Sequence, residues 1–171
     1  MNTKVCAAPD LVSVDFKTAE KSVKKLQRRI AEAYSRRCFD KVDYLQHLLM
    51  QSYYAKVLAV SIVGSSRGRY TIGVDGRAFE DTLYTNYSYK QRNFIPAPLR
   101  RIYVPTGSGR TRPISIPTVT DQITQTLYKL SLEPIAELMV DECSFGFRKN
   151  RSSQGAIIRG MDILLYKPEM K

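Results

Sequence analysis

Residues 98–117 constrain the fold of this chain most strongly, because their pattern predicts a β-hairpin. The apolar residues of its two arms are Leu99, Ile102, Val104, Ile114 and Ile116. Gly107-Ser108-Gly109 lies between the arms and supplies two glycines for the positive φ angles of a tight turn. We therefore expect a short antiparallel ribbon, connected to segments whose apolar residues recur at helical spacing.

Four arginines lie on or beside this hairpin: Arg100, Arg101, Arg110 and Arg112. A guanidinium group is planar and can hold two oxygens of one phosphate, so a ribbon with several arginines suits phosphate binding. An ordinary edge hairpin whose arginines face solvent would show the same residues. The hairpin alone leaves both interpretations open.

The charge of the whole chain favours a polyanionic partner. Its 171 residues include 27 Lys and Arg but only 16 Asp and Glu, which gives a net charge of +11. Nucleic acid is the partner that this excess favours. A membrane surface is disfavoured, because no apolar run reaches the roughly 18 residues of a bilayer span and no amphipathic anchor stands out. The amino terminus lacks the apolar core of a signal peptide, so we do not expect secretion.

Cysteine and histidine usage excludes two classes of chemistry. Cys6, Cys38 and Cys143 are far apart and odd in number, which fits neither a disulfide framework nor a metal site. We expect reduced thiols in a cytosolic type of compartment. His47 is the only histidine and lies on a helical stretch, so histidine-dependent triads are disfavoured.

A basic helix is predicted over residues 17–37, after a loose arm at residues 1–16. Its apolar stripe consists of Val23, Leu26, Ile30 and Ala33. Its cations are Lys21, Lys24, Lys25, Arg28, Arg29, Arg36 and Arg37. Only Glu20 and Glu32 oppose them, which favours a surface that faces nucleic acid over one that is merely solvated.

Residues 40–60 are predicted to complete a helical hairpin with the first helix. Asp40 precedes a run of apolar residues at helical spacing and is the expected N-cap. The buried face of that run is expected to contain Val42, Leu45, Leu48 and Leu49. The continuation from Ser52 to Val60 carries Tyr53 and Tyr54, which could pack in the core or stack on bases.

Residues 64–76 form a long glycine-rich connection that carries Arg67 and Arg69. Connections of this length inside compact chains are usually functional or disordered. This one is not a phosphate loop, because it lacks the Gly-Lys-Ser/Thr ending and no strand precedes it. A short helix is expected over residues 77–92, directly before the hairpin.

A long helix is predicted to follow the hairpin. Thr118, with Asp121 three residues on, is the expected N-cap of a helix that runs to about Glu133. Pro134 is expected to interrupt this helix and to begin a further turn through Val140.

A second basic loop is expected at residues 144–152. It combines two phenylalanines with Arg148, Lys149 and Arg151. Ser152 or Ser153 then caps a final apolar helix.

In their order along the chain, these segments resemble the amino-terminal part of a group II intron reverse transcriptase, the intron-encoded maturase. The motifs that carry the resemblance are Gly73-Val74-Asp75-Gly76, Pro96 to Pro105, Arg112 to Pro117, Leu132-Glu133-Pro134 and Ser144 to Arg148 with Arg151-Ser152. The resemblance covers roughly residues 20–166, and it is the ordered set of motifs that is specific.

The resemblance implies an α+β, mainly α fold without a palm. Residues 17–76 would be a helical amino-terminal extension with a glycine-rich template loop. Residues 77–171 would be the fingers region, with the hairpin at about 98–117, the second basic loop at 144–152 and the final helix.

The resemblance also implies roles for individual residues. Arg112 is expected to contact the triphosphate of an incoming nucleotide, and Arg110 could replace a lysine of the family that is Thr106 here. The expected RNA-binding residues are Lys24, Lys25, Arg28, Arg29, Arg36, Arg37, Arg67, Arg69, Arg100, Arg101, Arg148, Lys149 and Arg151.

Polymerase chemistry requires two metal ions about 4 Å apart, held by converging carboxylates. The family places these downstream of the segments found here, and Asp141-Glu142 is interpreted as a surface pair at a helix end. We therefore expect no catalytic residue, no metal and no cofactor in this chain, and no DNA synthesis by it alone. Mg²⁺ is expected for the intact polymerase.

The expected function is an RNA-binding fingers fragment of a reverse transcriptase and maturase. The expected partners are intron RNA or a template strand, together with a palm and thumb in cis or in trans. The chain could be an excised piece, a truncated product or half of a split enzyme, in a bacterial cytoplasm or an organelle. Two alternatives stay open: a stand-alone RNA chaperone that assists splicing, and a basic ribosome-associated structural protein.

Overall fold

The computed structural model describes residues 16–80, 94–107 and 109–165. The helices are α1 (Phe16–Ser35), α2 (Phe39–Gln51), α3 (Tyr53–Ser65), α5 (Val119–Met139) and α6 (Ser153–Leu165), with a 3₁₀ helix η1 (Arg67–Tyr70). The strands are β1 (Arg100–Pro105) and β2 (Thr111–Ile116). The predicted α+β, mainly α class is confirmed. The loose arm over 1–16 and the short helix over 77–92 fall largely outside the described residues.

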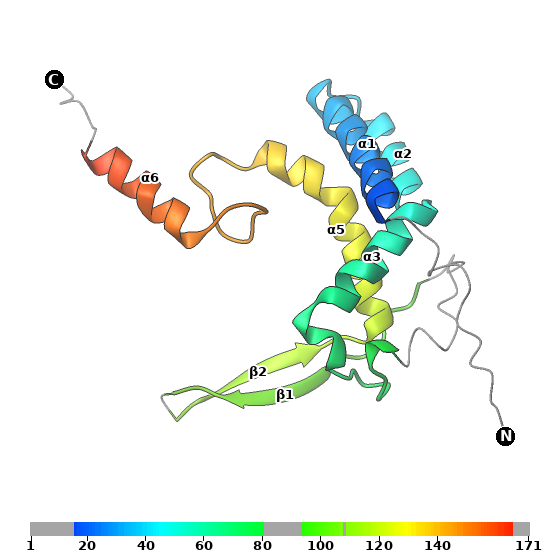
Figure 1. Ribbon diagram of the computed structural model, residues 1–171, viewed down its shortest axis with the longest axis vertical. Helices are drawn as coiled ribbons and strands as arrows, with labels where there is room; N and C mark the ends of the chain where they lie inside the picture. The colour runs from blue at the N-terminus through cyan, green and yellow to red at the C-terminus, as the bar shows by residue number, and fades with distance from the viewer. Residues whose placement is uncertain (1–15, 81–93, 108, 166–171) are drawn as a thin grey trace.

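The core is a cluster of four helices, α1, α2, α3 and α5 (Figure 1). Its largest fully buried side chains are Ile30, Leu45, Leu49, Ile123, Val23, Val57 and Val119. The apolar stripe predicted for the first helix is confirmed, with Leu26 half-buried at its edge. The helices come together because each buries one apolar face, while α3, almost without charged residues, is covered on several sides.

The second predicted helix is in fact two helices. Ser52 adopts an extended conformation, with φ −63° and ψ 131°, and thereby separates α2 from α3. The predicted N-cap at Asp40 is wrong, because α2 begins at Phe39 and Cys38 occupies the cap position without a side-chain hydrogen bond. Asp40 instead lies in the first turn, where a negative charge complements the helix dipole.

Helix α5 continues through Pro134 to Met139, so the predicted interruption is wrong. A proline inside a helix has no N–H for the carbonyl four residues earlier, which here belongs to Leu130. Two other helices supply donors at this point. Gln27 of α1 donates from Nε2 to the carbonyl oxygen of Leu130 at 2.8 Å, and Gln46 of α2 donates to that of Ser131 at 3.2 Å.

The amino end of α5 is hydrogen-bonded to the segments that enter and leave the hairpin. Thr118 is the N-cap, as predicted, and its Oγ1 accepts a hydrogen bond from the backbone N–H of Asp121. The buried Asp121 carboxylate accepts from Thr118 Oγ1 at 2.8 Å and from the backbone N–H of Ala97 at 3.3 Å. Ala97 precedes β1 and Thr118 follows β2, so one side chain joins the two ends of the ribbon.

Two glycines allow the 64–79 segment to pack closely on the helices. A Cβ added to Gly73 would lie 2.8 Å from the Cα of Thr118, and one added to Gly64 would lie 2.6 Å from the Phe79 ring. Real side chains do not tolerate such distances. The predicted glycine-rich connection therefore begins as the last turn of α3, passes through η1, and ends against the base of the hairpin.

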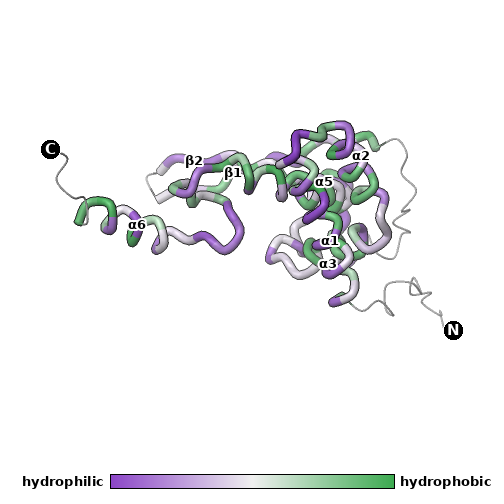
Figure 2. Tube along the Cα trace, turned by 90° about the horizontal axis from the view of Figure 1, so that it is seen from above, coloured by the Kyte–Doolittle hydropathy of each residue, from purple (hydrophilic) through white to green (hydrophobic). Residues whose placement is uncertain are grey.

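Two projections leave the bundle on the same side, from opposite ends of α5 (Figures 1 and 2). The hairpin leaves from the amino end, and the 140–152 loop leads to α6 from the carboxyl end. Helix α6 has no buried residue, although Ile157, Ile158, Met161, Leu164 and Leu165 are apolar. Ser152 caps it through a hydrogen bond from the Gly155 N–H to Oγ, as predicted. None of the described helices is both long and apolar enough to cross a bilayer.

Candidate nucleic-acid interface

The outward face of α1 is the largest group of exposed cations on one element. Val23 and Ile30 turn inward, which leaves the intervening basic residues in solvent. The exposed basic residues of this helix are Lys17, Lys21, Lys24, Lys25, Arg28 and Arg29. Five of them belong to the predicted set of cations and Lys17 is an addition, and we call these six residues the α1 basic face.

Lys24 of the α1 basic face forms an ion pair with Glu20, one helical turn earlier. Its Nζ lies 2.8 Å from Oε1 of Glu20, and both side chains are more than half exposed. The hydrogen bond from Lys24 lowers the pKa of Glu20, and the charge of Lys149 lowers it slightly further. Exposed pairs of this kind contribute little to stability, so Lys24 stays available to an anionic ligand.

Arg36 and Arg37 form the turn that ends α1. Arg37 has φ +56°, a left-handed conformation that is uncommon outside glycine. The N–H of Cys38 donates to Ala33 and that of Arg37 donates to Tyr34, which together make a Schellman motif. The motif requires a left-handed residue at this position. The backbone of Arg37 is therefore fixed, and with it the direction of its Cα–Cβ bond.

The hairpin register places its arginines on different faces. Arg100 pairs with Ile116, and Val104 pairs with Arg112, so Arg112 shares a face with the apolar residues Ile102 and Ile114. The adjacent Arg101 lies on the other face. The ribbon is exposed along most of its length, since Ile116 is its one fully buried residue.

Arg100 connects the hairpin to the glycine-rich loop. Its Nη1 donates to the carbonyl oxygen of Ile72 at 3.3 Å. Arg100 therefore joins two segments of the protein, while Arg101 and Arg112 extend into solvent. RNA contact by Arg100 and Arg101 stays a prediction, and the register places these two side chains on opposite faces of the ribbon.

The hairpin turn gives Thr106 a structural role. Its backbone N–H donates to the carbonyl of Arg110 at 2.7 Å, and its Oγ1 donates to the same oxygen at 2.6 Å. Gly109 takes the positive φ of the turn, at +75°, whereas Gly107 does not, so the prediction of two left-handed glycines is half right. The turn uses the backbone of Arg110 and leaves its side chain exposed.

The two arginines of η1 differ in their surroundings. Arg69 stacks over the ring of Tyr70 at 4.5 Å, bonds to its hydroxyl group, and donates to the carbonyl of Gly64 at 3.4 Å. Arg67 is exposed, and no partner for its side chain occurs in the described ranges. Of this pair, Arg67 is the cation that a ligand could reach without breaking an internal contact.

In the second basic loop, Arg148 is held by the protein itself. Its Nη2 lies 2.7 Å from Oε2 of Glu137 on α5, and its Nη1 donates at 2.9 Å to the carbonyls of Asp141 and Ser144. The hydrogen bond from Arg148 lowers the pKa of Glu137, and the same contact raises that of Arg148. These contacts favour a structural role for Arg148, and RNA contact by it stays a prediction.

The neighbouring cations of this loop are more open. Arg151 stacks over the Phe145 ring at 5.2 Å, and Lys149 is exposed. Lys149 lines a pocket of about 270 Å³ together with Gln27 of α1 and Pro134 of α5. The tertiary structure thus brings Lys149 to the edge of the α1 basic face, although more than a hundred residues separate them along the chain.

Several of the predicted residues therefore form two groups along α5. The α1 basic face and Lys149 lie beside its carboxyl half, where Gln27 reaches Leu130. The hairpin with Arg101, Arg110 and Arg112 leaves its amino end at Asp121. Roughly 14 Å of helix axis separates Asp121 from Leu130.

Sequence reasoning missed the residues that position these groups. Gln27 and Glu137 were unremarkable polar residues in the sequence, and their partners lie far along the chain or beyond a loop. Phe39 and Tyr34 were also missed, although they flank the basic turn at Arg36 and Arg37. An aromatic residue on each side of two arginines was the one local signal that could have drawn attention to them.

Metal binding has no donor set in the described residues. No group of three or more His, Cys, Asp or Glu side chains that could hold an ion occurs in 16–80, 94–107 or 109–165. The Mg²⁺ ions that the family's chemistry implies do not fit this part of the chain.

A family model matches the first part of the chain. Residues 12–86 match the model described as the N-terminal domain of reverse transcriptase. This range contains α1, α2, α3 and the glycine-rich loop, the segments that carry and support the α1 basic face.

Three relatives show which known proteins this chain is similar to. Protein YkfC of Escherichia coli (strain K12) is 35% identical over 107 residues, which cover 58% of this chain and 28% of YkfC. The group II intron-encoded protein LtrA of Lactococcus lactis subsp. cremoris is 31% identical over 144 residues, 81% of this chain and 22% of LtrA. Maturase-like protein 1 of Euglena gracilis is 31% identical over 142 residues, 77% of this chain and 31% of that protein.

The chain corresponds to the amino-terminal region of the group II intron reverse transcriptase and maturase family, as its motifs implied. It spans less than a third of the length of each of these three relatives.

Proposed function

We propose that this chain binds RNA mainly through the phosphate backbone, with intron RNA or a template strand as the ligand. It would do so as the amino-terminal extension and fingers of a group II intron reverse transcriptase and maturase. The names of the relatives LtrA and maturase-like protein 1 support an intron-related role.

The α1 basic face is the observation that carries this proposal. Lys21, Lys25, Arg28 and Arg29 are exposed there, and no carboxylate pairs with them within the described part of the chain. A cluster of unpaired cations on a rigid helix is an electrostatic footprint for a polyanion. Lys149 extends the same footprint from the second basic loop.

For the intact protein we propose RNA-templated DNA synthesis and assistance to intron splicing. A palm and thumb, in cis or in trans, would supply the carboxylates for two Mg²⁺ ions. Arg112, with Arg110 at the hairpin turn, would contact the triphosphate of the nucleotide. The protein would work where its intron is transcribed, in a bacterial cytoplasm or an organelle.

The salt dependence of RNA binding tests the proposal. About six phosphate contacts give a log–log slope of roughly −4 on a single strand. Replacing Arg28 and Arg29 by alanine should reduce the slope by about 0.7 for each lost contact. Lys129→Ala is the matched control, because Lys129 is an exposed cation of α5 that lies beside α3. A flat salt response would overturn the proposal.

A second measurement separates a polymerase region from a stand-alone RNA chaperone. With a palm supplied, Arg112→Ala should impair nucleotide use and leave RNA affinity nearly unchanged. A chaperone would show the reverse, with affinity governed by Arg28, Arg29 and Arg36. The chain alone, with Mg²⁺ and nucleotides, should extend no primer.

A further inference from the structure

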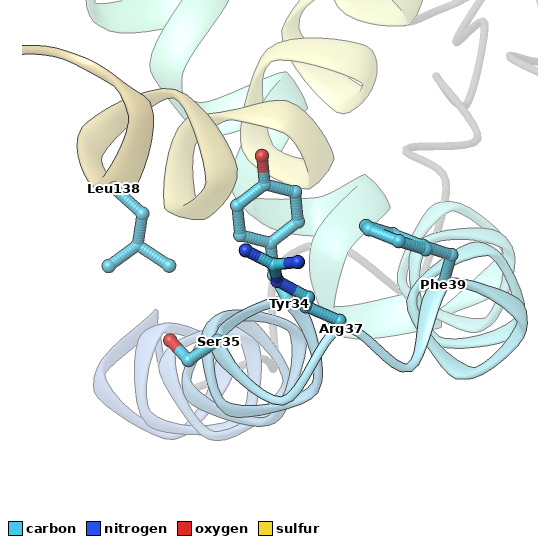
Figure 3. A pocket seen from close by; sticks show the side chains of 5 residues that line it. All are labelled: Tyr34, Ser35, Arg37, Phe39 and Leu138. Carbon is cyan, nitrogen blue, oxygen red and sulfur yellow. The ribbon is translucent and has the colours of Figure 1, made fainter.

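A pocket of about 460 Å³ lies where the end of α1, the start of α2 and the end of α5 meet. It is lined by Tyr34, Ser35, Arg37, Phe39 and Leu138. Figure 3 shows Phe39 and Leu138 on opposite sides of Tyr34 and Arg37. The volume falls within the range of sites that hold a small organic group, from about 300 to 1,000 Å³.

The aromatic wall of this pocket is incompletely covered. The rings of Tyr34 and Phe39 meet edge to face, with centroids 6.1 Å apart and planes at 72°. Phe39 is nevertheless 57% exposed, and Leu138 across the pocket is 49% exposed. An open aromatic face beside an aliphatic side chain offers a stacking surface for a planar ligand.

The cation of this pocket is held in place by the backbone. Arg37 has φ +56° within the Schellman motif that ends α1. Its side chain is exposed and has no hydrogen-bond or ion-pair partner in the described ranges. A non-glycine residue in this conformation costs free energy, so a glycine would be the more stable choice at this position. This chain thus has an arginine in a strained conformation beside an open aromatic ring.

We propose that this pocket binds one unstacked base of the RNA, with Phe39 stacking on the base and Arg37 bonding to its phosphate. This inference rests on the proposed RNA binding and adds a stacking contact to a phosphate-based interface. Single-stranded RNA is recognised in this manner, by aromatic stacking combined with a nearby guanidinium. The basic turn at Arg36 and Arg37 connects the pocket to the α1 basic face, so a single strand can engage both.

The test compares two probes of equal length and charge. One is a single-stranded oligoribonucleotide, and the other is a ribose-phosphate oligomer without bases. The native protein should bind the first probe more tightly than the second. Phe39→Ala should weaken binding of the first by at least about fivefold and leave binding of the second unchanged. Tyr44→Ala is the matched control, because Tyr44 is an exposed aromatic of α2 outside the pocket.

Two more variants complete the test. Phe39→Leu keeps an apolar side chain but removes the ring, so it should reproduce the loss of Phe39→Ala in a folded protein. Arg37→Gly keeps the left-handed backbone and removes the guanidinium, so it should weaken both probes. A fluorescent base analogue in the first probe should be quenched on binding by the native protein and not by Phe39→Leu.

The outcomes separate this inference from the proposed function. If both probes bind equally, or if the Phe39 variants bind RNA as the native protein does, the base-binding pocket is overturned and backbone binding stands. If the native protein binds neither probe at any salt concentration, both the proposed function and the pocket are overturned.

Discussion

The side-chain amide of Gln27 lies 2.8 Å from the carbonyl oxygen of Leu130, the acceptor that Pro134 cannot serve within its own helix. One hydrogen bond from α1 therefore allows α5 to continue through a proline. The same bond fixes the α1 basic face against the carboxyl half of α5. The position of the α1 basic face thus depends in part on an uncharged residue of the same helix.

Gln27→Ala should lower the free energy of unfolding by about 1–3 kcal/mol, because a buried carbonyl loses its donor. Urea denaturation followed by circular dichroism measures this. Pro134→Ala restores the backbone N–H, so Gln27→Ala should cost far less in that background. If Gln27→Ala lowers the free energy of unfolding equally in both backgrounds, the hydrogen bond to Leu130 is not the cause of the destabilisation.

Asp121→Ala should destabilise the protein by about 1–3 kcal/mol, because it removes the acceptor for Thr118 Oγ1 and for the Ala97 N–H. Thr118→Ala should cost about 1 kcal/mol through loss of the helix cap. Gln125→Ala, at an exposed site on the same helix, is the control. Amide hydrogen exchange in the hairpin should also accelerate in Asp121→Ala, and unchanged protection there would contradict the joining role.

The second basic loop should loosen in acid. Arg148 lowers the pKa of Glu137, so this pair stabilises the fold above the ordinary carboxyl pKa of 4.5. That contribution is lost as the pH falls through the lowered pKa, where Glu137 takes up a proton. Proteolysis within residues 144–152, measured between pH 6 and pH 3 with an acid-tolerant protease, should rise over that window. Glu137→Gln should remove the pH dependence, and a native-like profile in this variant would exclude the pair as its cause.

Arg37→Gly should raise the free energy of unfolding by about 0.5–1 kcal/mol, because glycine adopts the left-handed conformation without strain. Arg36→Gly is the matched control: Arg36 lacks a positive φ, so the same change there should lower stability. Thermal unfolding measures both. Stabilisation by both changes, or by neither, would contradict the strain at Arg37.

Local patterns in the sequence determined several elements of this protein. Each of these elements depends on contacts between residues that are close in the sequence. Examples are the helical spacing of Val23 and Ile30, the turn glycine at Gly109 and the helix cap at Thr118. The separation of Arg100 from Arg101 also follows from the two-residue period of a strand. Such features can be predicted from the sequence because their physical causes are local.

The tertiary structure decided what depends on distant partners. Pro134 stays inside a helix because Gln27, more than a hundred residues earlier, supplies the missing donor. Arg148 turns inward because Glu137 and two carbonyls converge on it, and the pocket at Arg37 exists because Leu138 arrives from α5. A sequence states which hydrogen-bonding groups are present, but only packing brings a donor within 3 Å of its acceptor.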